Sequence, residues 1–330
     1  MVTESLLGGG TMPYTKRILT CLCFSLCVFL TPALGQTAEF PTKPISLIIP
    51  YPAGGATDVV IRPLAAAAKE FLKQPVVIEN KPGGGTAVGI GSIIGKRPDG
   101  YQLSIAATTI HRTSFISKIS FDTVNDLTPI LRVGGYCFGI LVRPDSPFKT
   151  LKDLVDYAKA NPDKLTYMSG GIGTGGHIAM EELAFKAGFK INHVPSKGDP
   201  EASTGLLGGH VDAASASSGW IPLVEAGSLK LLATYGGKRT KRFPDVPTVS
   251  ELGYKVVEEL PMGIFGPKGM PKDLVATLDL AFKKALSDPI FVSTMDKYEM
   301  PILYQDPEVF TKFWAEAYKE AGEHIKKYIR

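Results

Sequence analysis

The chain has 330 residues, four cysteines and a formal net charge of +4 at pH 7. Hydrophobic residues make up 44% of it, which suffices for a globular core. The mild positive charge weakly favours anionic ligands, and no basic stripe suggests nucleic acid binding. Three cysteines lie in the N-terminal apolar segment, so beyond that segment Cys137 has no partner for an internal disulfide. We interpret Cys137 as a small buried side chain.

The N-terminus has the pattern of a secretory signal peptide. Lys16 and Arg17 precede an apolar run over residues 18–30, and small residues precede Gln36. The run is too short to span a bilayer, and no cysteine follows a cleavage motif as a lipid anchor would require. We therefore expect residues 1–35 to be removed and the mature chain to be a soluble, exported protein.

Residues 45–62 predict a strand, a glycine turn and a helix. The stretch begins with an apolar run, Gly54 and Gly55 then permit a tight turn, and Thr57 with Asp58 should supply a cap and an acid for the first turn of the helix that follows. The free amides and the dipole at a helix N-terminus favour negative charge, so this arrangement predicts an anion site. A plain strand-to-helix connection without a ligand is the alternative.

The rest of the chain alternates predicted strands and helices, which indicates parallel sheets covered by helices. We expect further strands at 76–78, 101–107, 165–168, 191–194, 210–214 and 229–234. We expect helices at 86–96, 151–160, 271–287, 289–297 and 307–328, and two more that end near 186 and 206. The strand at 101–107 leads into Thr108 and Thr109, whose hydroxyls lie where open α/β sheets bind ligands, although both residues suit ordinary caps.

Two long apolar stretches, residues 129–143 and 256–265, predict crossings between two lobes. The first lobe then comprises residues 36–138 and 262–330, and the second comprises residues 139–261. Two lobes joined by two extended segments predict a hinged protein with its ligand cleft between them. The C-terminal helices should pack on the first lobe, and the last of them is amphipathic.

A second glycine turn, SGGIGTGGH from Ser169 to His177, lies between a strand and a helix in the second lobe. If both turns face the cleft, a carboxylate between them receives several amide hydrogen bonds. Each hydrogen bond to a charged group contributes roughly 1.5–3 kcal/mol, so a few suffice for the ~8 kcal/mol of micromolar binding. Such a site requires no metal and no cofactor.

Two enzyme interpretations compete with this one. Residues 171–176 contain a formal G-x-G-x-x-G with Asp199 downstream, which a dinucleotide-dependent dehydrogenase would show, but a lone fingerprint is weak evidence. Ser169 and His177, with Asp199 or Asp212, suggest a hydrolase, but no G-x-S-x-G surrounds the serine. The five histidines show no paired helical spacing and no cysteine partners, so we expect no metal site. We expect a binding protein without catalytic residues.

Several motifs in order along the chain resemble one family. The chain is similar to the Bug (TctC-like) family, the periplasmic solute-binding proteins of tripartite tricarboxylate transporters. The matching stretches are PYPAGGATD at 50–58, QPVVIENKPGGG at 74–85, RPDGYQL at 97–103, GTGGH at 173–177, LLGGHVD at 206–212 and FPDVPTVSELG at 243–253.

The resemblance implies a two-lobed type II periplasmic binding protein fold of the α/β class. It would have two parallel-type sheets flanked by helices and two crossover strands as the hinge. It also implies a monomeric periplasmic receptor that passes a small organic acid to membrane permease subunits, with the ligand carboxylate held by main-chain amides and bridging water. The ligand contacts carried over onto this chain are Ala53, Gly54, Gly55, Thr57, Asp58, Thr108, Thr109, Ser169, Gly173, Thr174, His177 and Lys197.

The chain departs from the family pattern at two places. Ser196 stands where many members have a tyrosine, and residues 214–218 form a small polar run where many carry an acid. The missing acid argues against an amine-bearing ligand, so we expect a simple aliphatic or aromatic dicarboxylate. A receptor that feeds a sensor kinase instead of a permease is an open alternative.

Overall fold

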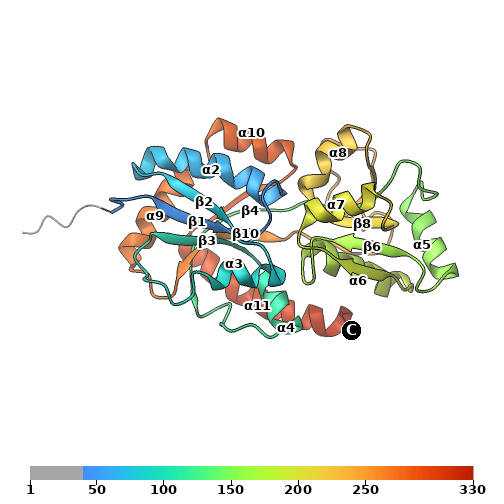
Figure 1. Cartoon of the computed structure of the whole chain (residues 1–330), viewed down its shortest axis with the longest axis horizontal. Coiled ribbons are helices and arrows are strands. Elements are labelled where there is room, and N and C mark those ends of the chain that lie inside the picture. The colour runs from blue at the N-terminus through green and yellow to red at the C-terminus, as the bar shows by residue number, and fades with distance from the viewer. Residues whose placement is uncertain (1–39, 330) are drawn as a thin grey trace, which may run out of the picture. The chain divides into compact units, whose positions relative to one another are not determined.

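Residues 40–329, which the computed structural model describes, fold around two sheets (Figure 1). The predicted signal peptide, residues 1–35, lies outside the described residues. Within the described part, no helix combines the length and apolar character that a membrane crossing needs.

The first sheet has the strand order β11-β4-β10-β3-β1-β2. Its strands are β1 (Ile45–Ile49), β2 (Val76–Asn80), β3 (Gln102–Ala107), β4 (Leu127–Gly135), β10 (Pro261–Pro267) and β11 (Ile302–Gln305). Strand β1 pairs in parallel with β2 and β3, as the alternation of strands and helices predicts. Strand β10 is antiparallel to β3 and β4, and β11 is antiparallel to β4.

The second sheet has the order β7-β6-β8-β5-β9. Its strands are β5 (Phe138–Val142), β6 (Thr166–Ser169), β7 (Asn192–Pro195), β8 (Ala213–Ser217) and β9 (Lys230–Thr234). Strand β6 is parallel to β7 and β8, but β5 is antiparallel to β8 and β9.

Both sheets are therefore mixed, and the expectation of two parallel-type sheets is wrong in this respect. Two of the strands that run against their sheets, β5 and β10, come from the two crossings, and the third, β11, follows α10 (Pro289–Lys297). Strand β4 continues through Tyr136 and Cys137 directly into β5, and the chain returns to the first sheet as β10. Strands β5 and β10 take their direction from the path of the chain between the sheets, whereas a β–α–β unit would have made each of them parallel to its neighbours.

Helices cover both faces of each sheet. They are α2 (Ala56–Leu72), α3 (Ala87–Gly91), α4 (Thr109–Ile116), α5 (Leu151–Ala160), α6 (Gly175–Ala187), α7 (Asp199–Leu207), α8 (Ile221–Glu225), α9 (Lys272–Ala285), α10 (Pro289–Lys297) and α11 (Pro307–Tyr328). In Figure 1, α2 and α10 lie on one side of the first sheet, and α3, α4 and α11 lie on the other.

Strand β1 is buried on both faces, as its near-continuous apolar sequence predicts. Leu47 and Ile49 belong to the core that includes α2 and α9, whereas Ile48 packs with Ile90 and Trp314 on the opposite face. Each fully buried aliphatic side chain contributes about 1.5–3 kcal/mol, so a strand covered on both faces is strongly held. The first glycine turn is thus mounted on a rigid strand.

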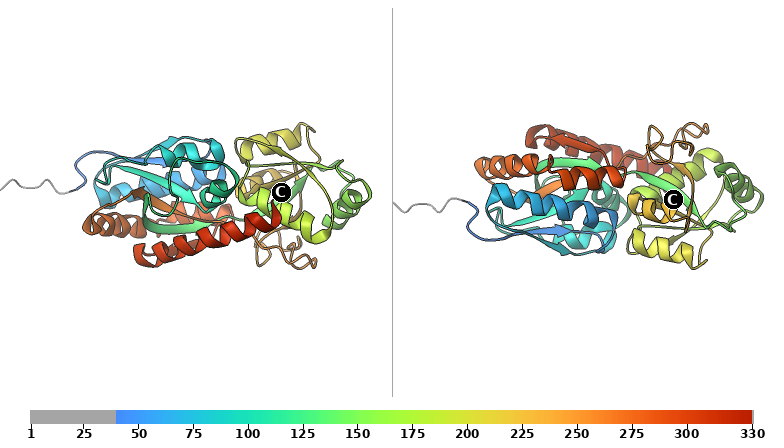
Figure 2. Two further views of the ribbon diagram at one scale, coloured as in Figure 1. Left: turned by 90° about the horizontal axis from the view of Figure 1, so that it is seen from below. Right: turned by 90° about the horizontal axis from the view of Figure 1, so that it is seen from above.

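The C-terminal helix α11 packs on α4 and β4, as its apolar face predicts. Trp314 is buried and its Nε1 donates to the Thr123 carbonyl at 2.8 Å. The helix also reaches α6 beside the second sheet, where His324 Nε2 lies 3.1 Å from Glu182 Oε2. Figure 2 shows α11, in red, running beside the first sheet toward the second. The helix therefore contacts both lobes and not the first alone.

Several boundaries differ from the prediction for local reasons. The helix expected over 86–96 is reduced to a 3₁₀ turn and the short α3, because Gly83, Gly84 and Gly85 all have positive φ and Gly91 ends the helix. The strand expected from 256 begins only at Pro261, as β10. Helix α4 and strand β11 were not predicted.

Candidate ligand-binding site

The first glycine turn connects β1 to α2. Gly54 has φ +76°, a left-handed conformation that favours glycine. The helix begins after Gly55 and no side chain caps it, so the expected side-chain cap is wrong, whereas Asp58 is the acid of the first helical turn as predicted. The Thr57 hydroxyl instead forms a hydrogen bond of 2.8 Å with the Tyr136 hydroxyl on the crossing segment. The first-turn amides of α2 are left free for a ligand.

Asp58 braces this turn from behind. Its carboxylate accepts hydrogen bonds from the Gly54 amide at 2.9 Å, from Arg62 Nε at 3.0 Å and from Asn80 Nδ2 at 2.9 Å. Burial acts to raise the pKa of Asp58, but the hydrogen bonds from Arg62 and Gly54 outweigh it and hold that pKa below its usual value. Asp58 is therefore a charged structural support of the turn.

The second glycine turn connects β6 to α6 and follows the same design. Gly171 and Gly173 have positive φ, and the Thr174 hydroxyl donates to the Gly171 carbonyl at 2.7 Å. A methyl group at Gly176 would lie 2.1 Å from the Ser215 carbonyl oxygen. The glycine fingerprint at 171–176 therefore serves the turn and the close packing of α6 on β8.

Two stacked histidines support the second turn. His177 Nδ1 accepts a hydrogen bond of 3.2 Å from the Gly173 amide, and its ring lies 4.3 Å from the His193 ring. His193 Nε2 lies 2.8 Å from the Ser169 hydroxyl. Burial lowers the pKa of His177 to about 3 and that of His193 to about 4, so both rings are neutral at pH 7.

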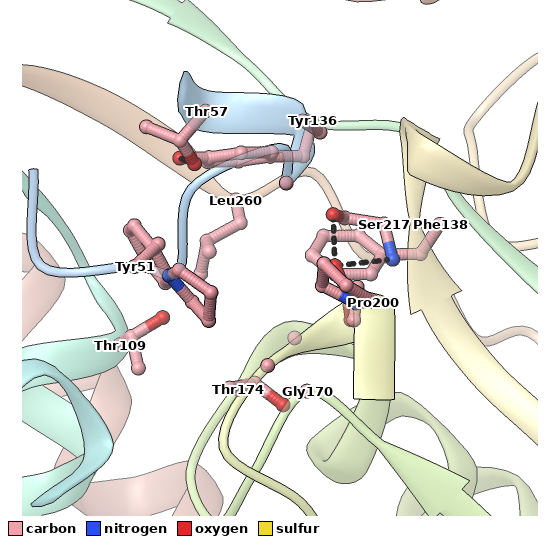
Figure 3. Close-up of a pocket in the computed structure, with 16 residues that line it drawn as sticks. Tyr51, Thr57, Thr109, Tyr136, Phe138, Gly170, Thr174, Pro200, Ser217 and Leu260 are labelled. Atoms are coloured by element: carbon pink, nitrogen blue, oxygen red, sulfur yellow. Dashed lines mark hydrogen bonds between the residues drawn. The ribbon is translucent and has the colours of Figure 1, made fainter. Parts of the chain in front are cut away.

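A pocket lies between the two turns, and residues of the turns and helix starts, of the second sheet and of the crossings line it (Figure 3). The space open to the centre of a water molecule is about 30 Å³, which admits a group the size of a carboxylate. The lining residues are Tyr51, Pro52, Gly55, Ala56, Thr57, Thr109, Tyr136, Phe138, Gly170, Thr174, Gly175, Gly198, Asp199, Pro200, Ser217 and Leu260.

The pocket wall combines apolar rings with hydroxyl groups and helix amides. None of its lining residues is a lysine, an arginine or a histidine, and Asp199 is its one acid. The hydroxyls of Tyr51 and Thr109 are buried and find no hydrogen-bond partner among residues 40–329. Burial raises the pKa of Tyr51 to about 12, so its hydroxyl keeps its proton. Donors are thus available for an anionic group.

The structure divides the twelve predicted site residues into three groups. Those that line this inner pocket are Gly55, Thr57, Thr109 and Thr174. Those that form or brace the two turns without lining it are Ala53, Gly54, Asp58, Ser169, Gly173 and His177. Those that line other cavities are Lys197 and Thr108.

Lys197 lines an outer cavity that adjoins the inner pocket and shares Tyr51, Gly170 and Thr174 with it. In the outer cavity, the space that the centre of a water molecule can occupy is about 250 Å³. Thr108 lines a separate cavity with Arg112 and other residues. The two adjacent threonines thus face different cavities, and only Thr109 belongs to the site.

Three residues of the pocket wall, Tyr51, Tyr136 and Ser217, are not among the predicted ligand contacts, and Asp199 is a candidate only in the enzyme interpretations. Tyr51 lies within the first turn motif, PYPAGGATD, so its position in that motif was a signal that could have identified it. Tyr136 and Ser217 come from the crossing and from the end of β8, and no local pattern points to them. Among the described residues, no group of three or more His, Cys, Asp or Glu side chains is placed to hold a metal ion.

Two lobes with a small pocket between paired helix N-termini are the arrangement expected of a solute-binding protein. The family model described as "Tripartite tricarboxylate transporter family receptor" matches residues 60–329. The chain belongs to this family. The family and the fold are those of solute-binding proteins and not of enzymes, so the dehydrogenase and hydrolase interpretations are set aside.

Individual relatives agree with this assignment. A protein encoded in the gbd 5' region of Cupriavidus necator is 44% identical over 296 residues, 90% of each chain. The structure of the periplasmic binding protein BugD is 30% identical, with a TM-score of 0.83 over 87% of this chain and 98% of that one.

Two structures with bound acids share the fold. MatC of Rhodopseudomonas palustris with bound malate has a TM-score of 0.82 at 24% identity, over 87% of this chain and 100% of that one. An R. palustris protein with adipate has a TM-score of 0.83 at 24% identity, over 87% and 98% of the two chains.

Proposed function

We propose that this protein is a periplasmic receptor that captures a small dicarboxylate and delivers it to a tripartite tricarboxylate transporter permease. The observation that carries the proposal is the pocket between two helix N-termini, whose wall has hydroxyl and amide donors but no basic side chain. Amide donors and helix dipoles stabilise a carboxylate without a counter-cation. The family's transporter name and the neighbours with malate and adipate support the substrate class.

The two cavities suit an acid with two charged ends. The inner pocket has room for one carboxylate, and the adjoining outer cavity has Lys197 on its wall. A ligand that spans both cavities contacts both glycine turns only when the lobes are closed. That difference in contacts between open and closed states is what drives closure. We further propose that the N-terminal segment exports the chain, as the signal pattern predicts.

Thr109 offers a sharp test of the pocket. Its hydroxyl is buried without a protein partner, so Thr109→Val removes no internal hydrogen bond. We expect calorimetric titration with succinate, glutarate and adipate to show binding to the wild type. For the best of these acids, Thr109→Val should weaken the affinity about tenfold with an unchanged melting temperature.

Thr234→Val is the matched control, because the Thr234 hydroxyl is likewise buried without a partner but lies outside the pocket. Equal affinities for the wild type and both variants would contradict the placement of the ligand. Delivery to a permease is tested separately, by uptake of the labelled acid in cells with and without this chain.

A further inference from the structure

Asp199, the first residue of α7, is the acid in the wall of the inner pocket. Its Oδ2 accepts hydrogen bonds from the Ser217 hydroxyl and from the Ser217 amide, the latter at 3.1 Å. Its Oδ1 lies against Gly170, where any Cβ atom would be only 2.6 Å away. None of the described residues donates a hydrogen bond to Oδ1. One carboxylate oxygen is therefore held by the protein, and the other is available.

The electrostatic surroundings leave this carboxylate without a counter-cation. No lysine, arginine or histidine lines the pocket, and the hydrogen bonds that Asp199 accepts come from the hydroxyl and the amide of Ser217. Burial raises the pKa of Asp199, and the negative charge of Asp199 adds to the rise in the pKa of both Tyr51 and Tyr136. The acid thus lies near the same hydroxyls that would face a ligand carboxylate.

A simple dicarboxylate fits this arrangement poorly. Its inner carboxylate would bring a second negative charge close to Asp199 with no cation between them, and like charges in a desolvated pocket repel. A ligand that carries a hydroxyl or ammonium group next to that carboxylate would instead donate to Oδ1. A hydrogen bond to a charged group is among the stronger ones available to a binding site.

We propose that Asp199 makes the pocket selective for organic acids with a hydrogen-bond donor, a hydroxyl or an ammonium group, beside the inner carboxylate. The inference rests on the proposed receptor function and refines its ligand class. It also revises the sequence argument, which favoured a plain diacid because residues 214–218 lack an acid. The acid reaches the pocket from α7 instead, next to Ser217 at the end of β8.

The test compares acids that differ only at the carbon beside the carboxylate. Succinate, malate and aspartate form one set, and glutarate, 2-hydroxyglutarate and glutamate form a second for a longer pocket. Calorimetric titration of the wild type should show that malate or aspartate, or the corresponding five-carbon acid, binds at least tenfold more tightly than the plain diacid.

The variant Asp199→Asn keeps the shape of the side chain and removes its charge. It should reduce the ratio of affinities between the donor-bearing acid and the plain diacid to less than threefold, chiefly by weakening the binding of the donor-bearing acid. Asp245→Asn is the control for net charge, because Asp245 is exposed and is not one of the residues that line the pocket, and it should leave the preference unchanged. Asp199→Ser, which is smaller and also neutral, replaces Asp199→Asn if circular dichroism shows that the latter is unfolded.

The outcomes separate the two proposals. Tight binding of donor-bearing acids that falls with Asp199→Asn supports the inference. Equal affinities within each set for the wild type, or a preference that survives in both neutral variants, overturn it and leave the receptor function in place. If none of the six acids binds, and no member of a wider carboxylate panel binds either, the proposed function itself is overturned.

Discussion

Acidification from pH 7.5 to pH 5 should destabilise the protein, because burial keeps three histidines, His111, His177 and His193, in the neutral form. His111 donates from Nε2 to the Trp314 carbonyl at 3.1 Å under α11, and His177 accepts from the Gly173 amide in the second turn. Burial lowers the pKa of each to about 3, compared with 6.5 for an ordinary histidine. Below pH 6.5 the unfolded chain therefore binds protons that the folded protein excludes, and the free energy of unfolding falls as the pH falls toward 3.

The size of the effect follows from the pKa difference. A pH of 5 is about 1.5 units below the pKa of a histidine in the unfolded chain, and each unit is worth about 1.4 kcal/mol of unfolding free energy. His111 and His177 then cost about 2 kcal/mol each and about 4 kcal/mol together, and His193, whose pKa is lowered to about 4, adds to this loss. Because a native protein is stable by about 5–15 kcal/mol, this is a large part of the total.

Urea unfolding at the two pH values, followed by circular dichroism, measures the effect. His177→Gln should lose about 2 kcal/mol less than the wild type between pH 7.5 and pH 5. The exposed His210 provides the control, and His210→Gln should behave like the wild type. Buried carboxyl groups such as Glu181 titrate alike in all three proteins and cancel in the comparison. An equal loss in His177→Gln and the wild type would refute the reasoning.

Four further substitutions test the packing and the turns. Trp314→Ala should lower the free energy of unfolding by about 3–5 kcal/mol in urea, and a loss under 1 kcal/mol would contradict its place in the core. Gly176→Ala brings a methyl group to 2.1 Å from the Ser215 oxygen and should cost more than 3 kcal/mol. Gly188→Ala meets no atom within 4 Å and should cost only about 1 kcal/mol, so similar melting temperatures for the two would count against the close packing. Asp58→Ala removes three hydrogen bonds from the first turn and should lower both stability and acid affinity, and calorimetry that finds full affinity would show that the turn needs no brace.

The features predicted well are those encoded by neighbouring residues. The last helix runs from Pro307 to Tyr328 as predicted, because Asp306 accepts from the Val309 amide and Pro307 occupies the first turn. Both glycine turns lie between a strand and a helix as predicted. Their motifs place glycines where the backbone has positive φ, at Gly54 in the first turn and at Gly171 and Gly173 in the second.

The features missed depend on contacts between distant segments. Strand β5 lies between β8 and β9, and no repeat or spacing in the sequence specifies that order or its antiparallel direction. For the same reason Tyr136, Asp199 and Ser217 meet in one pocket from three separate segments. Local patterns predict elements and turns, whereas the sheet order that assembles the pocket wall is set by tertiary packing.

The direction of a polar side chain in a turn was also beyond the sequence. Asp58 and His177 stand in the two turn motifs next to residues that line the pocket, and both point back to amides of their own turns. Thr108 and Thr109 differ by one position and face different cavities. Residue type and position identified the turn in each case, but the side that each chain faces was decided by its hydrogen-bond partners.

The most direct test of the account is a thermal-shift screen of residues 36–330 against mono-, di- and tricarboxylates, hydroxy and amino acids, and nicotinamide dinucleotides. A ligand at a hundred times its dissociation constant adds about 2.7 kcal/mol of stability, which is readily seen as a raised melting temperature. The account predicts a clear rise with one small group of organic acids and none with the dinucleotides. The account would be contradicted if the dinucleotides alone raised the melting temperature, or if none of the acids raised it.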